Sequence, residues 1–282
     1  MGDQMAKLGG CGIGLRREHY DFVLSERPDV PWFEVISENF MVPGGRPRHV
    51  LERVRKDYPL VLHGVSLSLG SDEPLNPEHL LRLKQLVAEV QPALVSDHLC
   101  WTGLGGHNSH DLLPLPFTEE AVWRCAVKIC QIQEQLGRRI LVENISTYLR
   151  FEGTPMKEWE FVSAVLEEAD CGLLLDINNV YLNSRNHGFD PVQYIESLPV
   201  DRVYQFHLAG QQVQDGDYVI DTHDDSISET VWELYRTAVR RFGPAPTLIE
   251  RDANIPEFPL LHSEARLADR IAAAAWAQVQ GA

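Results

Sequence analysis

Eight short apolar runs recur along the chain, each bounded by turn residues or by a segment of helical periodicity. The runs cover residues 10–15, 32–39, 60–68, 93–99, 138–146, 171–181, 203–210 and 246–252. Helical periodicity fills several of the intervals, over 77–90, 118–136, 157–169 and 228–242. Strands that alternate with helices pair in parallel through right-handed crossovers, and eight such units close a (β/α)8 barrel. The sequence therefore predicts an α/β fold of the TIM-barrel type.

The length of 282 residues fits one such barrel, because α/β barrels run to roughly 250 residues as a single domain. The chain has no internal repeat, low-complexity tract or linker, so we expect one domain over 1–282. An open doubly wound sheet is the alternative, and it usually carries a phosphate-binding loop after its first strand. The GGCGIG segment at 9–14 has the wrong spacing for that loop, and no Walker lysine follows it. These features favour the barrel.

The charge and cysteine content exclude several classes of protein. A net charge of -16 and the lack of a Lys/Arg stripe argue against nucleic acid as the main partner. The five cysteines are odd in number and lack a CxxC spacing, which argues against a disulfide framework or a thiolate zinc site. No segment approaches about 18 apolar residues, and the N-terminus lacks a secretory apolar region. We expect a cytoplasmic protein that does not enter a membrane.

Histidines and carboxylates stand at the ends of most predicted strands, where the active sites of such barrels lie. These residues are His63, His98, Glu143, Asp176, His207 and Glu250, and the loop after the seventh strand adds Asp221 and His223. Side chains two positions apart share one face of a strand, so Glu143 continues the face of Leu141. The same alternation predicts that Asp97 and Arg251 point away from the barrel axis.

This convergence predicts a metal centre with several ions. A lone histidine at a strand end is most often structural. Here four carboxylates and four histidines are predicted to point into one mouth of the barrel, which a structural role does not explain. Buried carboxylates whose negative charge is not compensated must bind protons. Two or three divalent cations would supply that compensation. Nitrogen and oxygen donors without thiolates suit iron, manganese or catalytic zinc, and the residues alone do not choose among them.

Three other segments are weaker candidates. Residues 107–111, HNSHD, lie in a Gly-rich region after the fourth strand and are predicted as a solvated loop, with a lid or substrate clamp as the alternative. The sequence Ser37, Glu38, Asn39 ends the second strand and either faces the same mouth or caps a helix. Cys100 follows His98 closely, and we interpret it as a small packed thiol rather than a reactive one.

Seven motifs in order resemble one known family. They are LHGVSLSLG (62–70), SDHLCW (96–101), LVENIS (141–146), LLDINNVYLNS (174–184), HLAG (207–210), DTHDD (221–225) and LIERD (248–252). The combination is similar to the multinuclear non-haem iron-dependent oxidative enzymes, which include the methanobactin-biosynthesis oxidase and were long known only as a domain of unknown function. The resemblance runs from about Gly12 to Ile271, nearly the whole chain.

The resemblance implies a barrel of the xylose-isomerase and endonuclease IV type that holds two or three irons, with ferrous and ferric ions together and dioxygen as co-substrate. The implied substrate is a cysteine of a ribosomally made precursor peptide, and a small protein that grips the leader peptide is the implied partner. The matching ligand positions are His63, His98, Glu143, Asp176, Asn179, His207, Asp221, His223 and Glu250. Among these, Glu143, Asp176 and His207 are the implied catalytic positions.

Two other enzyme classes stay open. The same order of ligands is similar to the trinuclear zinc site of endonuclease IV, a metal-dependent phosphodiesterase. That enzyme has a histidine three residues after the aspartate of the sixth strand, whereas this chain has Asn179, a neutral and weaker oxygen donor. A sugar-isomerase-like enzyme is the third possibility, and a metal-binding or peptide-binding protein without catalysis is the fourth.

Overall fold

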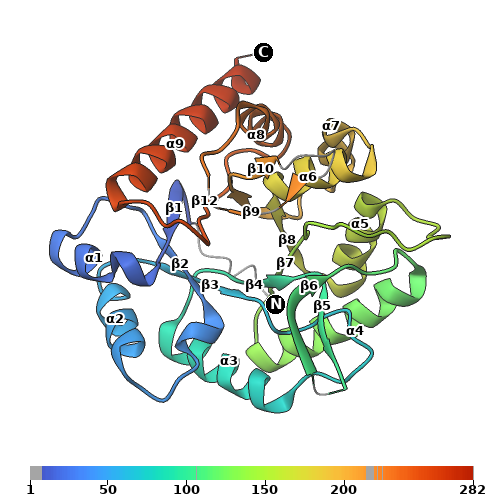
Figure 1. The fold of residues 1–282 in the computed structure, drawn as a ribbon, viewed down its shortest axis with the longest axis horizontal. Helices are drawn as coiled ribbons and strands as arrows, with labels where there is room; N and C mark the ends of the chain where they lie inside the picture. The colour runs from blue at the N-terminus through green and yellow to red at the C-terminus, as the bar shows by residue number, and fades with distance from the viewer. Residues whose placement is uncertain (1–7, 106, 214–218, 221, 224, 282) are drawn as a thin grey trace.

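Eight parallel strands form a closed barrel in the computed structural model, which describes residues 8–105, 107–213, 219–220, 222–223 and 225–281. Around the barrel the strands follow the order β1-β12-β9-β8-β7-β4-β3-β2, with helices outside them (Figure 1). Their bounds are β1 Cys11–Gly14, β2 Phe33–Ile36, β3 Leu60–Gly64, β4 Val95–His98, β7 Leu141–Glu143, β8 Gly172–Asp176, β9 Val203–Leu208 and β12 Thr247–Ile249. Each strand lies inside one of the predicted runs, so the predicted TIM barrel is confirmed.

The helices follow the strands, as the alternation predicts. They are α1 Tyr20–Glu26, α2 Arg46–Val54, α3 Pro77–Val90, α4 Glu119–Leu136, α5 Glu158–Ala169, α6 Ile177–His187, α7 Pro191–Ser197, α8 Glu229–Phe242 and α9 Phe258–Gln280. Two short 3-10 helices cover Arg17–His19 and Ser37–Phe40. Thr118 caps α4 by accepting a hydrogen bond from the Ala121 amide at 3.2 Å, and Ser228 caps α8 in the same way. The helical segments predicted over 77–90, 118–136, 157–169 and 228–242 are confirmed within one residue at their starts.

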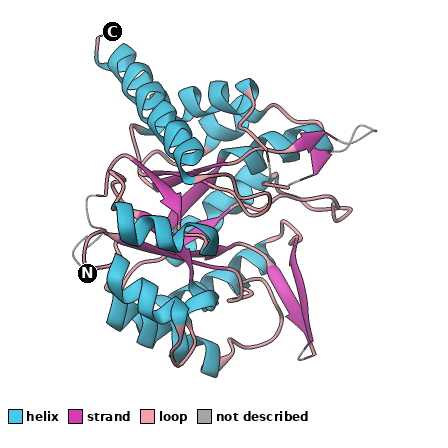
Figure 2. Ribbon diagram, turned by 60° about the vertical axis from the view of Figure 1, so that its left-hand side comes forward, coloured by secondary structure: helices cyan, strands magenta, loops and turns pink. Residues whose placement is uncertain are grey.

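Two antiparallel pairs lie outside the barrel. Strands β5 Trp101–Leu104 and β6 His107–Leu113 form a hairpin, which Figure 2 shows projecting from the rim, and β10 Gln212–Val213 pairs with β11 Val219–Ile220. The prediction of a solvated loop over 107–111 is therefore wrong, because these residues are strand. Polar residues such as His107 and Ser109 give no alternation of apolar and polar side chains, so pairing with β5 rather than local propensity makes the strand.

A layer of apolar side chains fills the barrel interior beneath the polar mouth. Its buried members are Trp32, Val61, Leu94, Leu141, Leu174 and Leu248. Gly12 leaves room for this layer, because a Cβ at that position would lie 2.4 Å from the Trp32 ring. Two residues further along the strands, the same faces carry Glu143, Asp176 and Glu250. The interior is thus packed at one end and polar at the other.

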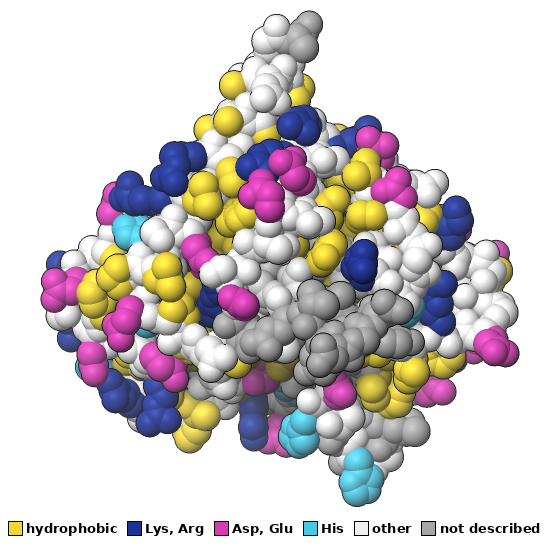
Figure 3. All heavy atoms as spheres, turned by 45° about the horizontal axis from the view of Figure 1, so that its top comes forward, with side chains coloured by type: hydrophobic (Ala, Val, Ile, Leu, Met, Phe, Trp, Pro, Cys, Tyr) yellow, Lys and Arg dark blue, Asp and Glu magenta, His cyan; other side chains and the backbone are white. Residues whose placement is uncertain are grey.

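The larger core lies between the strands and the surrounding helices, with fully buried side chains such as Phe206 and Tyr235. Lys and Arg side chains are interspersed with Asp and Glu over the face that Figure 3 shows. Across the described ranges, no helix combines the length and apolar character needed to cross a membrane.

Candidate metal centre

His63, His98 and Glu143 form the first group of converging donor atoms. They end the adjacent strands β3, β4 and β7, and His98 lies directly beside Glu143 in the strand register. The Nε2 atoms of His63 and His98 lie 3.2 and 3.4 Å from Glu143 Oε2. All three side chains are buried. Ligand atoms so close together can surround one cation.

The other ring nitrogen of each histidine determines which atom faces this group. His98 Nδ1 lies 3.0 Å from the Gly64 carbonyl oxygen, which can only accept, so Nδ1 carries a proton. When the His98 ring is neutral, as a metal ligand must be, Nε2 presents its lone pair toward Glu143. His63 Nδ1 lies 2.8 Å from Ser96 Oγ in the matching arrangement. Metal-binding histidines are commonly oriented through the second nitrogen in this way.

A second group shares Glu143 and adds Asp176, His207 and Glu250. His207 Nδ1 lies 3.4 Å from Glu143 Oε1 and 3.2 Å from Glu250 Oε2. Strand β8 brings Asp176 beside His207 of β9 in the register. Four side chains predicted from separate strands therefore meet at one point, and all are buried.

Glu34 and Gln205 complete the surroundings of His207, and the sequence analysis did not name either. Glu34 Oε2 lies 3.2 Å from His207 Nε2 and accepts a hydrogen bond from Gln205 Nε2 at 2.7 Å. A proton on His207 Nε2 can therefore be donated to Glu34, which leaves Nδ1 free to face the second group. Alternation was the signal available for Glu34, since it lies two residues after the interior Trp32.

The third group joins Glu250 to His223 and Asp252. His223 Nδ1 lies 3.5 Å from Glu250 Oε2 and 3.1 Å from Asp252 Oδ2. Arg16 donates to Asp252 Oδ1 at 2.5 Å, and its guanidinium is 3.7 Å from Glu250. Asp252 and Arg16 were missed, because they lie three and two residues beyond the ends of β12 and β1, in the loops that follow. The predicted ligand Asp221 lies outside the described residues.

Asp176 and Asn179 form the junction between β8 and α6. Asp176 Oδ1 accepts from the Asn179 amide at 2.6 Å and so caps α6. Asn144, in the loop after β7, bonds both the amide and the carbonyl of Asp176 at 2.9 Å. Asn179 donates through Nδ2 to the Asn144 carbonyl at 3.0 Å, while its Oδ1 accepts no hydrogen bond from the described residues. The Asn179 side-chain oxygen is thus oriented by the Nδ2 hydrogen bond and keeps its lone pairs for a ligand.

The two residues predicted to face outward, Asp97 and Arg251, make contacts outside the donor groups. Asp97 accepts hydrogen bonds from the His98 and Leu67 amides, and burial raises the pKa of Asp97 to about 7. Arg251 Nη2 donates to both carboxylate oxygens of Glu264, at 2.8 and 2.9 Å. Neither belongs to the three groups of donor atoms, as the alternation predicts.

Glu38 lies beside this backbone but outside those groups. It accepts from the Val65 amide at 3.0 Å, and its carboxylate lies 3.7 Å from His79. Ser37 to Phe40 form a 3-10 helix after the second strand. This segment is therefore part of the structural framework around the mouth of the barrel. Cys100 is fully buried, and burial raises the pKa of its thiol, which is the behaviour of a packed side chain.

Opposing charges balance inside the centre. Burial favours neutral Glu143, but His98, His207 and His63 outweigh it and lower the pKa of Glu143 to about 2. Burial likewise opposes a charged His207, yet Glu34, Glu143 and Glu250 raise the pKa of His207 well above its usual value. Glu143 is thus ionised and needs positive charge nearby, which either protons on histidine or metal cations can supply.

The donor set fits metal ions better than an ion-pair network. Glu143 Oε2 and His207 Nδ1 are buried and lie within 3.5 Å of opposite partners, yet neither makes a hydrogen bond of acceptable geometry to a described residue. The donor atoms of their group all lie within 4.8 Å of one another, close enough to surround one ion. Buried polar groups without hydrogen bonds are costly unless an ion occupies that space.

A family model for the RiPP precursor modification enzymes MbnB/TglH/ChrH matches residues 10–273. The chain belongs to this family. The match covers all eight barrel strands and every residue of the three donor groups. The resemblance drawn from the seven motifs is therefore confirmed, and the chain is a member of a family of enzymes that modify ribosomally made precursor peptides.

Relatives of the same size support this membership. A UPF0276 protein of Acaryochloris marina is 52% identical over 265 residues, which cover 94% of this chain and 95% of the relative. Another, of an Anaeromyxobacter species, is 51% identical and covers 97% and 96% of the two chains. Each alignment thus covers more than nine-tenths of both proteins.

Solved structures with similar folds are distant in sequence. Endonuclease IV of Thermus thermophilus gives a TM-score of 0.59 at 15% identity, covering 94% of this chain and 99% of that enzyme. A D-psicose 3-epimerase with D-fructose gives 0.58 at 11% identity, covering 95% and 97%. At such identities the similarity establishes the barrel type and carries no activity across.

Proposed function

We propose that this chain binds two or three iron ions at the three donor groups and uses dioxygen to oxidise cysteine residues of a ribosomally made precursor peptide. The observation that carries the proposal is the chain of shared carboxylates. Glu143 belongs to the first and second groups, and Glu250 belongs to the second and third. The family membership supplies the class of substrate.

Shared carboxylates support more than one metal ion. A carboxylate has two oxygens and can bridge two cations, which in multinuclear sites lie roughly 3.5–4 Å apart. Glu143 Oε2 lies near His63 and His98 while Oε1 lies near His207, so this one carboxylate could serve both donor groups. We assign His63, His98, Glu143, Asp176, Asn179, His207, Asp221, His223 and Glu250 as ligands. Asp252 is a further candidate through the third group.

The residues of the chain would hold and orient the irons and the peptide. Bound iron would supply redox chemistry with dioxygen, which no side chain of the site can provide. Glu34 holds the Nε2 proton of His207, and Gly64 holds the Nδ1 proton of His98, so each ring keeps one orientation. Arg16 places a fixed positive charge beside Glu250 and Asp252. We place Glu143, Asp176 and His207 closest to the reacting atoms.

The surroundings of the reaction follow from the same proposal. We propose a cytoplasmic location, where the five free cysteines stay reduced. We also propose a small partner protein that binds the leader peptide. We expect that nucleic acid is not a substrate, because the chain has a net charge of -16.

The test is turnover of a defined peptide. A short open reading frame with C-terminal cysteines beside the gene would give the peptide to synthesise. Iron-loaded protein with dioxygen should change the mass of that peptide at a cysteine, with and without the product of any adjacent small gene. No change under dioxygen, together with cleavage of an abasic-site oligonucleotide by the zinc-loaded protein, would favour the phosphodiesterase instead.

A further inference from the structure

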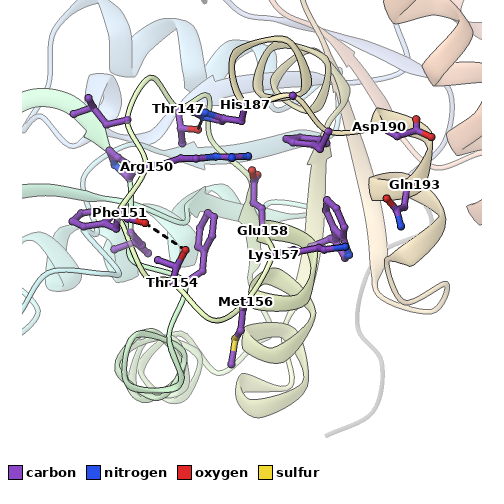
Figure 4. Close-up of a pocket in the computed structure, with 17 residues that line it drawn as sticks. Thr147, Arg150, Phe151, Thr154, Met156, Lys157, Glu158, His187, Asp190 and Gln193 are labelled. Atoms are coloured by element: carbon purple, nitrogen blue, oxygen red, sulfur yellow. Dashed lines mark hydrogen bonds between the residues drawn. The ribbon is translucent and has the colours of Figure 1, made fainter.

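A cavity of about 520 Å³ lies between the loop after β7, the last residue of α6 and the start of α7. Phe117, Trp159 and Phe189 contribute aromatic walls, and the Trp159 and Phe189 rings pack edge to face at 5.7 Å. Figure 4 shows the Arg150 and Glu158 side chains projecting toward each other across its middle. Eight apolar and eight polar side chains line the cavity, so it can enclose an apolar group and also offer hydrogen bonds.

The loop that borders this cavity exposes an unusual run of large apolar side chains. Tyr148, Leu149 and Phe151 are 41%, 71% and 45% exposed within four residues of sequence. Leu149 and Phe151 line the cavity, and Phe151 also lines a second hollow of about 310 Å³. Adjoining exposed apolar side chains are unfavourable in water and mark surfaces that bind a partner. Leu115 and Phe151 line both hollows, so the two adjoin.

Helix α6 connects the cavity to the metal centre. Asn179, Asn183 and His187 are spaced four residues apart and therefore share one face of this helix. Asn179 lies at the centre, whereas Asn183 donates to the Glu158 carboxylate at 3.1 Å and His187 Nε2 lies 2.6 Å from Thr147 Oγ1. The distance along the helix from Asn179 to His187 is about 12 Å. An extended peptide covers that distance in about four residues.

We propose that this cavity binds a large apolar side chain of the precursor peptide, about three to five residues from the cysteine that reaches the metal centre. The inference rests on the proposed function, because the peptide is its ligand. Aromatic walls fit an aromatic or branched aliphatic side chain, and Arg150 and Glu158 offer a donor and an acceptor to the peptide backbone beside it. The cavity thus sets which residue of the peptide is modified.

The test is selection of peptides for binding to the iron-loaded, full-length protein. A displayed library would fix one cysteine and randomise seven positions on each side. We expect enrichment of Phe, Trp, Tyr, Leu or Met at one position about three to five residues from the cysteine. Leu149→Asp and Phe151→Asp should each weaken binding of the enriched peptide about tenfold or more, since a charge enters the apolar contact.

Val200→Asp is the matched control. Val200 is 47% exposed in the loop before β9, at the amino-terminal end of the barrel strands, and does not line the cavity. This variant should bind the peptide as the unmodified protein does, and all three variants should keep the same iron content. Enrichment that survives both Leu149→Asp and Phe151→Asp, or no peptide binding at all, would overturn the inference.

A second library tests the proposed function independently of the cavity. A library with serine in place of the fixed cysteine reports on the metal centre. Equal binding of serine and cysteine peptides, with apolar enrichment that Leu149→Asp removes, would contradict cysteine recognition and leave the cavity assignment standing.

Discussion

Glu143 is the side chain on which the first two donor groups depend, because its two oxygens face different histidines. Glu143→Ala should therefore lose most of the bound metal together with activity, and Asp176→Ala should behave similarly. Metal analysis by mass spectrometry after gel filtration measures the loss. Glu134→Ala, on the exposed face of α4, should keep the full metal content. Full occupancy in Glu143→Ala would show that it is not a ligand.

Glu34 should act on the metal through His207 rather than by direct binding. In Glu34→Gln the neutral amide is a poorer acceptor for the His207 Nε2 proton, so we expect metal affinity to fall about 10–100-fold. Competition with a chromophoric chelator measures this affinity. Glu52→Gln, exposed on α2, is the control and should leave the affinity unchanged. An unchanged affinity in Glu34→Gln would remove Glu34 from the account.

Glu158 makes stability depend on pH. Burial raises its pKa from 4.5 to about 7, although Tyr194 and Asn183 hydrogen bonds oppose the shift. The folded protein therefore keeps the proton that the unfolded chain loses above pH 4.5, and its stability falls as pH rises from about 4.5 to 7. The loss amounts to up to about 3 kcal/mol.

Glu158→Gln keeps one acceptor oxygen and the shape of the protonated carboxyl group, and it lacks this titration. Urea unfolding at pH 5 and pH 8 should show a smaller difference for the variant than for the unmodified protein. Glu167→Gln, exposed on the same helix, should retain the full difference. Equal pH dependence in Glu158→Gln and the unmodified protein would contradict a raised pKa.

Strand alternation made most residues of the site predictable from the sequence. Residues to which that pattern does not extend were missed. His63, His98, Glu143, Asp176, His207 and Glu250 all come together as the alternation and the strand ends predicted. Glu34 was accessible to the same logic, but it lies in mid-strand, where a carboxylate gives no sign of a strand end. Asp252 and Arg16 approach the centre from loops whose course no periodicity describes.

At the scale of elements, Asn144 joins the end of β7 to the start of α6. Its amide group bonds the backbone of Asp176 twice, and Asn179 bonds its carbonyl. Asn144→Ala would leave buried backbone groups of Asp176 without partners. We expect a loss of about 2–4 kcal/mol in the free energy of unfolding, measured by urea denaturation.

The control for this variant is Asn39→Ala. Asn39 is exposed after β2, so its removal should change the free energy of unfolding by less than about 0.5 kcal/mol. Equal effects in the two variants would mean that water replaces the Asn144 hydrogen bonds and that the junction is looser than the distances indicate.

The barrel elements were predictable and the hairpin was not, for a physical reason. Barrel strands are buried on both faces and read as apolar runs between turn residues. Strand β6 has exposed polar residues at His107, Ser109 and His110, and its conformation depends on antiparallel pairing with β5. Such pairing between polar segments leaves little trace in one sequence.

At the scale of the whole molecule, the closed barrel links both ends of the chain through pairing of β1 with β12. We propose that 1–282 forms one domain, so urea should unfold the metal-free protein in a single transition by both tryptophan fluorescence and circular dichroism. Metal ions at 100 times their Kd should stabilise it by about 2.7 kcal/mol. Two separated transitions without metal would contradict a single domain.

Part of the net negative charge of the chain belongs to the candidate metal centre. Glu34, Glu143, Asp176 and Glu250 are buried there, so a share of the net charge of -16 sits inside the barrel rather than on the surface. Bound cations would offset that share.

The most direct test of the account is the metal itself. Protein purified without oxygen should contain two or three iron ions per chain and little zinc, and partial oxidation should give a mixed-valent electron paramagnetic resonance signal. Adding a cysteine-containing precursor peptide should change that signal, whereas the same peptide with serine should not. Redox-silent zinc as the native metal, or an iron signal indifferent to the cysteine peptide, would contradict the proposed oxidation.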